Sequence, residues 1–290
     1  MKTLNHNKNQ WMDTINEKFY NYTFSKEIKE ILDLSSSLNE KIKTEKNKSD
    51  GLWEVITKKL KIDWTYHSNS IEGSTLTFGE TLFFLNEGLT VEGKPFKDFL
   101  DAKNHAEAID YLHDIVANNR PLSESIIKEI NSLLLSGNNY TIARNSLGET
   151  VKKKLNAGEY KQHPNHVLKT DGSIHFYVEP IKVTEEIEEL IAWVKKEMDN
   201  VHPIILSATA HYNLVRIHPF DDGNGRGARI IMNLLLMKKG FYPVVVKTER
   251  KRQYLNVLSE ADQGNLNPFI EFIAHELIET YNAIISDLNI

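Results

Sequence analysis

Hydrophobic residues recur at intervals of three and four along almost the whole chain, and this spacing constrains the fold more than any other feature. The clearest runs are Ile28–Leu34, Leu52–Leu60 and Ile126–Leu134. Such spacing places the hydrophobic side chains on one face of an α-helix, where they can be buried together. We therefore expect a mainly α fold.

Boundary signals place some of these helices. Pro121, followed by Ser123 and Glu124, predicts a helix start, and Gly240 after two lysines predicts a helix end. The polar, Lys-rich stretch 43–50 predicts an exposed connection that separates an N-terminal helical extension from the rest of the chain.

One segment departs from the helical pattern. From about residue 166 to residue 178, β-branched and aromatic residues alternate with polar ones. The pair Asp171-Gly172 in the middle is favoured in tight hairpin turns. We expect a lone β-hairpin on a helical body, and this signal alone gives the hairpin no function.

The composition excludes several classes of function. Thirty-five basic residues stand against 40 acidic ones, so no global basic field draws the protein to nucleic acid. The absence of cysteine rules out disulfides, thiolate zinc sites and cysteine nucleophiles, and suits a cytoplasmic protein. No segment has the apolar run of a signal peptide or a membrane span. We expect neither a nucleic acid nor a membrane partner, no DNA-binding unit after residue 285, and a mature chain that is the whole chain.

The segment 218–229, HPFDDGNGRGAR, combines features of an anion-binding site. Residues 204–217 can form a helix that Pro219 ends, so His218 lies where helix becomes loop. A second helix is expected to begin after Gly225. Glycines near a helix start let backbone N–H groups approach an anion, and the helix dipole favours its negative charge. A phosphate group is the expected occupant.

The side chains in this segment suit attack on a nucleoside triphosphate. Arg226 and Arg229 project from one helix face toward the expected phosphates. Asp222 supplies a hard carboxylate oxygen for Mg²⁺, and His218 supplies a base that works near neutral pH. Each residue alone is more often structural, and their joint occurrence favours a catalytic site.

Other kinds of site fit these residues less well. An EF-hand starting at Asp222 would place Arg226 where an oxygen ligand is required. The glycines do not follow a strand, as a dinucleotide fingerprint requires. A zinc site built from His211, His218 and Asp222 stays conceivable, although the neighbouring arginines suit phosphates better.

Residues 218–229 resemble the signature of the Fic family, HPFx(D/E)GNGRxxR, at every specified position, and the resemblance extends over about residues 60–275. It implies a helical bundle with a β-hairpin flap beside the active site. It also implies transfer of AMP from ATP to a Tyr, Thr or Ser hydroxyl of a target protein, or of the enzyme itself. The catalytic core would span residues 96–290, behind an N-terminal extension at residues 1–95.

The resemblance further implies a role for each residue of the signature. His218 would deprotonate the target hydroxyl, and Asp222 would hold Mg²⁺. The residues that would bind the phosphates of ATP are Gly223, Asn224, Gly225, Arg226 and Arg229.

Residues outside the signature also receive roles by resemblance. Tyr254 and Asn256 would border the adenine, although Tyr254 is equally well explained as a core aromatic. Lys161 stands where family members often have Arg. The flap would hold the target segment by strand-like backbone pairing through Lys169, Thr170, Asp171 and Gly172.

Far upstream, Ser68–Gly73 resembles the inhibitory motif of the family, (S/T)xxxE(G/N). A Glu72 carboxylate paired with Arg229 would occupy the partner of the γ-phosphate and repel the phosphate itself. Gly73 suits the position after a helix that ends at Glu72. The resemblance also permits the reverse reaction, in which Glu72 positions a water molecule that removes AMP.

Two other functions stay open at this point. The first is another phosphate-ester transferase of the same fold, such as a kinase-like or phosphocholine-transferring enzyme, although the intact segment 223–226 favours AMP transfer. The second is a silenced interaction module, in which residues 1–50 dock a partner or form the interface of a homodimer.

Overall fold

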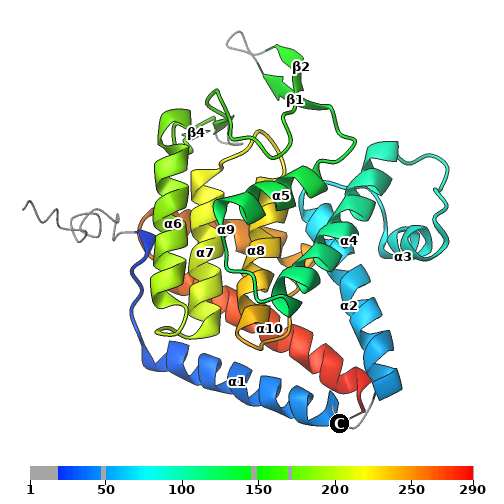
Figure 1. The fold of residues 1–290 in the computed structure, drawn as a ribbon, viewed down its shortest axis with the longest axis vertical. Coiled ribbons are helices and arrows are strands. Elements are labelled where there is room, and N and C mark those ends of the chain that lie inside the picture. The colour runs from blue at the N-terminus through cyan, green and yellow to red at the C-terminus, as the bar shows by residue number, and fades with distance from the viewer. Residues whose placement is uncertain (1–18, 47–49, 145–148, 169–171, 290) are drawn as a thin grey trace, which may run out of the picture.

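The computed structural model describes residues 19–46, 50–144, 149–168 and 172–289, which form a mainly helical body (Figure 1). The mainly α fold is thereby confirmed. The α-helices are α1 Lys26–Lys46, α2 Asp50–Ile71, α3 Phe78–Glu87, α4 Phe96–Ala117, α5 Glu124–Leu134, α6 Val183–Glu197, α7 Pro203–Ile217, α8 Asn224–Lys238, α9 Lys251–Asp262 and α10 Asn267–Asp287. None of the helices in the described ranges has the length and hydrophobicity needed to cross a bilayer.

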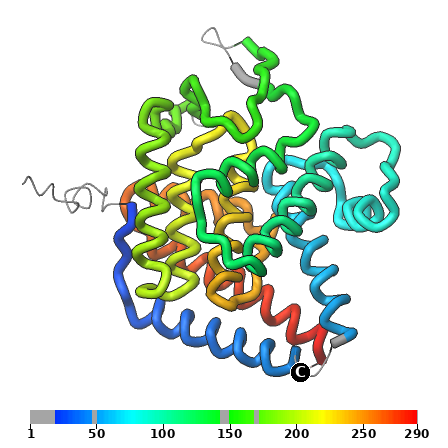
Figure 2. Tube along the Cα trace, in the orientation of Figure 1, coloured from blue at the N-terminus to red at the C-terminus, as the bar shows by residue number. Residues whose placement is uncertain are grey.

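Helices α7 and α8 form the centre of the body, and most of their side chains are buried. One hydrophobic cluster joins them to α4, α5 and α6, and a second joins them to α1, α9 and α10. The Cα trace shows α6 beside α7, and α1 running along α10 (Figure 2). Helices α7 and α8 are therefore packed against other helices on both sides.

The N-terminal helices share the core of the C-terminal ones. Ile28 and Ile42 of α1 are fully buried in the cluster that includes α10, and the Tyr281 hydroxyl of α10 donates a hydrogen bond of 3.0 Å to Asn39 Oδ1. The exposed connection predicted at residues 43–50 is wrong for residues 43–46, which belong to α1, and for Asp50, which begins α2. Residues 47–49 lie outside the described residues. The proposed division between residues 95 and 96 stays a prediction.

Not every residue of the predicted hydrophobic runs is buried. Leu34 is 49% exposed, Leu52 is 39% exposed and Val55 is 62% exposed. Helices α1 and α2 lie at the edge of the body, so only one side of each is covered.

The predicted boundaries of α5 and of the end of α8 agree with the structure, whereas the start of α8 does not. Ser123 caps α5, and Gly240 follows α8 with a φ of +74°. Helix α8 begins at Asn224, earlier than expected, because Gly223 takes a φ of +78° and serves as its N-cap. Asn224, Gly225 and Arg226 therefore form the first turn of the helix.

The predicted hairpin is present. Strand β3, Val167–Leu168, pairs antiparallel with β4, Ile174–His175. Its expected turn residues Lys169, Thr170 and Asp171 lie outside the described residues, whereas Gly172 is described with a φ of +84°.

The expectation of a lone hairpin is wrong, because β1, Tyr140–Arg144, pairs with β2, Thr150–Lys154 (Figure 1, top). This hairpin projects from the body, and its Tyr140 and Ile142 side chains are 59% and 67% exposed. The second strand contains three consecutive lysines, so it lacks the alternation that reveals a half-buried strand.

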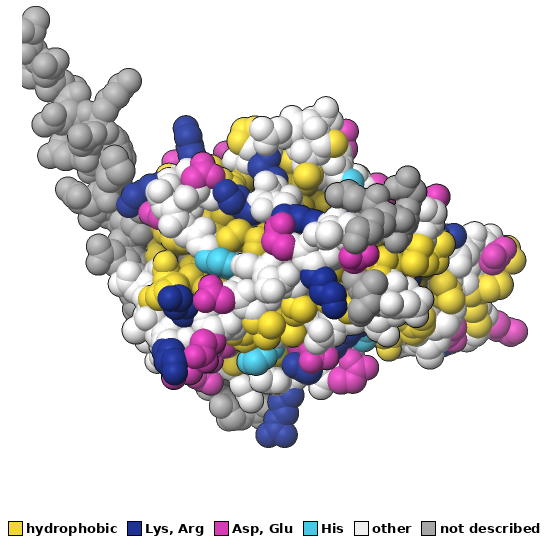
Figure 3. Space-filling view, turned by 90° about the horizontal axis from the view of Figure 1, so that it is seen from below, with side chains coloured by type: hydrophobic (Ala, Val, Ile, Leu, Met, Phe, Trp, Pro, Cys, Tyr) yellow, Lys and Arg dark blue, Asp and Glu magenta, His cyan; other side chains and the backbone are white. Residues whose placement is uncertain are grey.

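On the face seen from below, basic and acidic side chains are interspersed and neither sign forms a continuous field (Figure 3).

Candidate active site

The site is built on the loop 218–223 between α7 and α8. His218 ends α7 with φ 50° and ψ 58°, and its N–H donates to the Leu214 carbonyl at 3.0 Å. A left-handed conformation is unfavourable for a residue with a Cβ, and such residues cluster at functional sites. The conformation turns the chain sharply at His218 and directs it to the start of α8.

Two asparagines hold this loop in shape through the Phe220 backbone. The Asn224 Oδ1 accepts from the Phe220 N–H at 2.9 Å, and its Nδ2 donates to the Phe220 carbonyl at 2.8 Å. Asn165 Nδ2 donates to the same carbonyl at 2.8 Å. The Asn224 side chain thus shapes the loop, and any contact of this residue with a phosphate would use its backbone N–H in the first helical turn.

The His218 imidazole is neutral at physiological pH. Burial lowers the pKa of His218 to about 3, and the positive charge of Lys161 acts in the same direction. A neutral ring has a free lone pair on one nitrogen, which is the form that accepts a proton.

An aromatic residue that the sequence analysis missed covers this ring. Tyr177 stacks on His218 with 3.7 Å between ring centroids and 19° between ring planes. The Tyr177 N–H donates to His166 Nδ1 at 3.2 Å, across the base of the β3–β4 hairpin. The sequence feature that could have revealed Tyr177 is an aromatic residue two positions after β4, the second strand of this hairpin.

Lys161 holds the end of α7 and the start of the 218–223 loop through hydrogen bonds. Its N–H donates to the Pro219 carbonyl at 2.8 Å, and its Nζ donates to Asn165 Oδ1 at 2.8 Å and to the Ile217 carbonyl at 3.3 Å. Burial lowers the pKa of Lys161 to about 8. The residue that departs from the usual Arg therefore still holds the end of α7.

Asp222 offers the single carboxylate expected of a Mg²⁺ ligand. Its side chain is 30% exposed, and its Oδ1 accepts the Gly223 N–H at 2.6 Å. The described residues contain no cluster of three or more metal-binding side chains. A lone carboxylate suits Mg²⁺, which takes most of its other ligands from water and substrate phosphates.

Arg226 is held by a carboxylate that the sequence analysis did not identify. Arg226 Nη1 lies 2.9 Å from Asp101 Oδ1 of α4, and both side chains are less than 10% exposed. Asp101 also accepts hydrogen bonds from Asn138 and Lys97. The guanidinium is thus fixed beside the first turn of α8.

We expect Asp101→Ala to lower the free energy of unfolding by about 3 to 5 kcal/mol, because it removes the buried carboxylate beside a buried arginine. The other carboxylate near Arg226, that of Asp222, is 3.8 Å away and 30% exposed. Urea denaturation at pH 7 measures this loss. Asp110→Ala is the matched control, since this carboxylate of the same helix pairs with Lys61 but is 64% exposed. The control should change stability by less than about 1 kcal/mol, and equal losses would contradict the assignment.

Arg229 is fully enclosed and joins α8 to the end of α2. Its Nε donates to Ser68 Oγ at 3.0 Å, and its Nη2 donates to the Ser68 carbonyl at 2.9 Å and to Glu72 Oε1 at 2.7 Å. The predicted pairing of Glu72 with Arg229 is therefore present. Helix α2 ends at Ile71, one residue before the predicted end, and Gly73 follows with a φ of +101°.

The Glu72 carboxylate lies against the first turn of α8. A Cβ added to Gly225 would come within 2.3 Å of Glu72 Oε1. Desolvation opposes ionisation of Glu72, but the Arg229 guanidinium outweighs it and holds the pKa of this carboxyl below its usual range. A negative charge thus occupies the space in front of the expected phosphate-binding turn.

Tyr254 and Asn256 differ in their surroundings. The Tyr254 hydroxyl lies 2.9 Å from His211 Nε2 and accepts from Arg229 Nη1 at 3.5 Å, and the side chain is only 2% exposed. This burial fits the alternative of a core aromatic. Asn256 is exposed on α9.

A family of known proteins matches the part of the chain that contains this site. The sequence model of the Fic/DOC family matches residues 121–236, which include the whole 218–229 segment. The protein adenylyltransferase Fic of Nematostella vectensis is 33% identical over 226 residues, which are 78% of this chain and 49% of that protein. The protein adenylyltransferase fic-1 of Caenorhabditis elegans is 30% identical over 213 residues, 73% of this chain and 38% of that protein. The chain carries a Fic domain.

Solved structures agree with this assignment. A signaling protein from Bacteroides thetaiotaomicron that contains a Fic domain superposes with a TM-score of 0.74 at 28% identity, covering 87% of this chain and 97% of that one. Fic-1 from Caenorhabditis elegans superposes with a TM-score of 0.72 at 25% identity, covering 89% and 71%. This chain spans about half or less of the length of the curated relatives above. The family match at residues 121–236 includes the Fic signature. It does not include Ser68 or Glu72, which form hydrogen bonds with Arg229.

Proposed function

We propose that this Fic domain transfers AMP from ATP to a hydroxyl group of a protein. The observation that carries the proposal is the arrangement around the 218–223 loop, where a neutral His218 ends one helix and Arg229 lies on the next. The relatives named protein adenylyltransferase support the same activity.

The first turn of α8 is the proposed site for the phosphates of ATP. Its N–H groups lack partners within the helix, and the helix dipole favours negative charge there. Gly225 leaves the space for close approach, and Arg226 and Arg229 supply two guanidiniums. Asp222 would hold Mg²⁺, which neutralises phosphate charge when it is bound.

His218 is the proposed general base. Its neutral imidazole takes the proton of the target hydroxyl while the hydroxyl oxygen forms a bond to the α-phosphorus. The bond between the α-phosphorus and the oxygen that bridges to the β-phosphate breaks, and pyrophosphate leaves. The β3–β4 hairpin, which leads into Tyr177 over the His218 ring, is the proposed holder of the target segment.

Glu72 is the proposed inhibitor of this transfer. Its carboxylate accepts a hydrogen bond from Arg229 Nη2. The same oxygen, Oε1, lies 2.3 Å from the position that a Cβ on Gly225 would occupy. A γ-phosphate that approached Arg229 would meet this negative charge, so ATP would bind in an unproductive way. Removal of AMP with the help of Glu72 is a second proposed activity of the same site.

Labelled ATP tests the proposed reaction. We expect protein-bound label from ATP labelled at the α-phosphate and none from ATP labelled at the γ-phosphate, with both wild type and Glu72→Gly. Mass spectrometry should then find AMP on a Tyr, Thr or Ser hydroxyl of the protein itself or of a lysate protein. Label retained only from the γ-phosphate would instead identify a kinase-like enzyme, and no label from either would favour an interaction module.

A further inference from the structure

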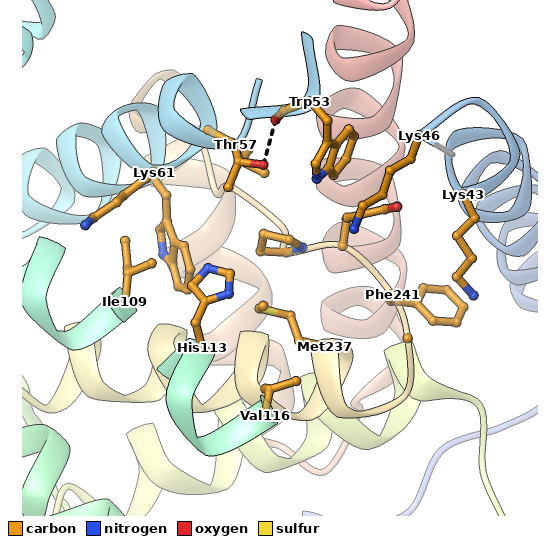
Figure 4. A pocket seen from close by; sticks show the side chains of 15 residues that line it. Lys43, Lys46, Trp53, Thr57, Lys61, Ile109, His113, Val116, Met237 and Phe241 are labelled. Carbon is orange, nitrogen blue, oxygen red and sulfur yellow. Dashed lines mark hydrogen bonds between the residues drawn. The ribbon is translucent and has the colours of Figure 1, made fainter. Parts of the chain in front are cut away.

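A cavity of about 510 Å³ lies away from the 218–223 loop, between α2, the end of α4 and the segment that follows α8 (Figure 4). Two residues from the last turn of α1 complete its lining. None of its fifteen lining residues belongs to the Fic signature. Its volume is in the usual range for pockets that bind small molecules.

The walls of this cavity are largely apolar and aromatic. The lining side chains of this kind are Trp53, Leu60, Trp64, Ile109, Val116, Met237, Phe241, Tyr242 and Pro243. Their own contacts hold several of them in place: Trp53 and Tyr242 pack with 4.9 Å between ring centroids, and Trp64 packs edge-on against His105. Such walls suit an aliphatic or aromatic group and offer little to a sugar or a free phosphate.

The charged residues of the lining all carry the same sign. They are Lys43, Lys46 and Lys61, and no Asp or Glu is found among the described residues that line the cavity. Lys61 Nζ lies 2.5 Å from Asp110, and Lys43 Nζ lies 2.7 Å from Glu40, so these two cations are already partly neutralised.

Lys46 is placed differently from the other two lysines. Its Nζ lies 5.0 Å from the centre of the Trp53 ring and 6.0 Å from that of Tyr242. Figure 4 shows its side chain extending beside Trp53 at the cavity. Ring faces attract an ammonium group but do not neutralise it. Within the part of the chain that the structure describes, Lys46 makes no ion pair, so its charge is available to an anion beside an apolar wall.

We propose that this cavity binds an amphipathic carboxylate, with its apolar body between Trp53, Met237 and Phe241 and its carboxylate against Lys46. A carboxylate loses its hydration when it enters such a site, and a fixed cation offsets that loss. The Lys46 ammonium attracts a carboxylate more strongly than a neutral group, and it repels a cation. The site is independent of the proposed AMP transfer.

Intrinsic tryptophan fluorescence can follow binding, because two of the four tryptophans of the chain line the cavity. The full-length protein is titrated with octanoate, octan-1-ol and octylammonium at pH 7, and with naphthalene-2-carboxylate to separate an aromatic from an aliphatic body. We expect saturable quenching with at least one carboxylate, at a concentration roughly tenfold or more below that needed for the alcohol. Octylammonium should not bind.

A charge variant and a matched control assign the binding to this cavity. Lys46→Met should weaken carboxylate binding roughly tenfold while leaving the alcohol unaffected. Lys58→Met should change neither, because Lys58 is an exposed cation of α2 outside the lining. Both lysines are exposed, so both variants should unfold at the temperature of the wild type. Equal carboxylate binding by wild type and Lys46→Met, or binding of the alcohol as tight as that of both carboxylates, would overturn the proposal.

Discussion

Replacing Glu72 by Gly is expected to raise the incorporation of AMP roughly tenfold or more. The Glu72 carboxylate makes a charge-assisted hydrogen bond of 2.7 Å to Arg229, and one such bond contributes about 1.5 to 3 kcal/mol. Without it, Arg229 is free to contact the γ-phosphate, and no negative charge faces the first turn of α8. The rate of label transfer from ATP labelled at the α-phosphate, at saturating ATP, measures the change.

Three further variants test whether the charge of Glu72 causes the inhibition. Glu72→Gln keeps the shape of the side chain and removes its charge, so it should raise transfer nearly as much as Glu72→Gly. Ser68→Ala removes one hydrogen bond to Arg229 Nε and leaves the carboxylate, so its effect should be smaller. Glu92→Gly, at an exposed loop position, should have no effect. Equal incorporation by wild type and Glu72→Gly would refute the inhibitory role.

The sequence predicted those parts of the site that are close together along the chain. Residues 218–223 form the loop between α7 and α8, and residues 224–229 form the first turns of α8, so their closeness along the chain brings them together. The pairing of Glu72 with Arg229 spans 157 positions, and it could be predicted only because each residue belongs to a recognisable motif.

Contacts set by tertiary packing escaped prediction. Asp101 reaches Arg226 because α4 packs on α8 at one particular rotation, and hydrophobic spacing on α4 does not determine which polar residue faces inward. Tyr177 covers His218 because the β3–β4 hairpin folds back over the loop. Local patterns place residues on elements, but the relative placement of elements depends on the whole core.

His218→Ala is expected to abolish AMP transfer, with a loss of about 10² to 10⁴ in rate, the usual contribution of a general base. No other imidazole lies on the 218–223 loop. The measurement is label transfer in the Glu72→Gly background, where the signal is largest. His163→Ala is the matched control. His163 is exposed, and together with His218 it lines a groove between the β1–β2 hairpin and the 218–223 loop. It should keep most of the activity.

The backbone of His218 makes a second substitution necessary. Its φ of 50° is unfavourable for alanine, so His218→Ala could lose activity through a distorted loop. Asparagine tolerates this left-handed conformation better than most residues and cannot act as a base at neutral pH. His218→Asn should therefore keep the thermal stability of the parent protein and lose transfer as completely as His218→Ala. Substantial transfer by His218→Asn would show that the loop geometry, and not proton removal by the imidazole, is what the reaction requires.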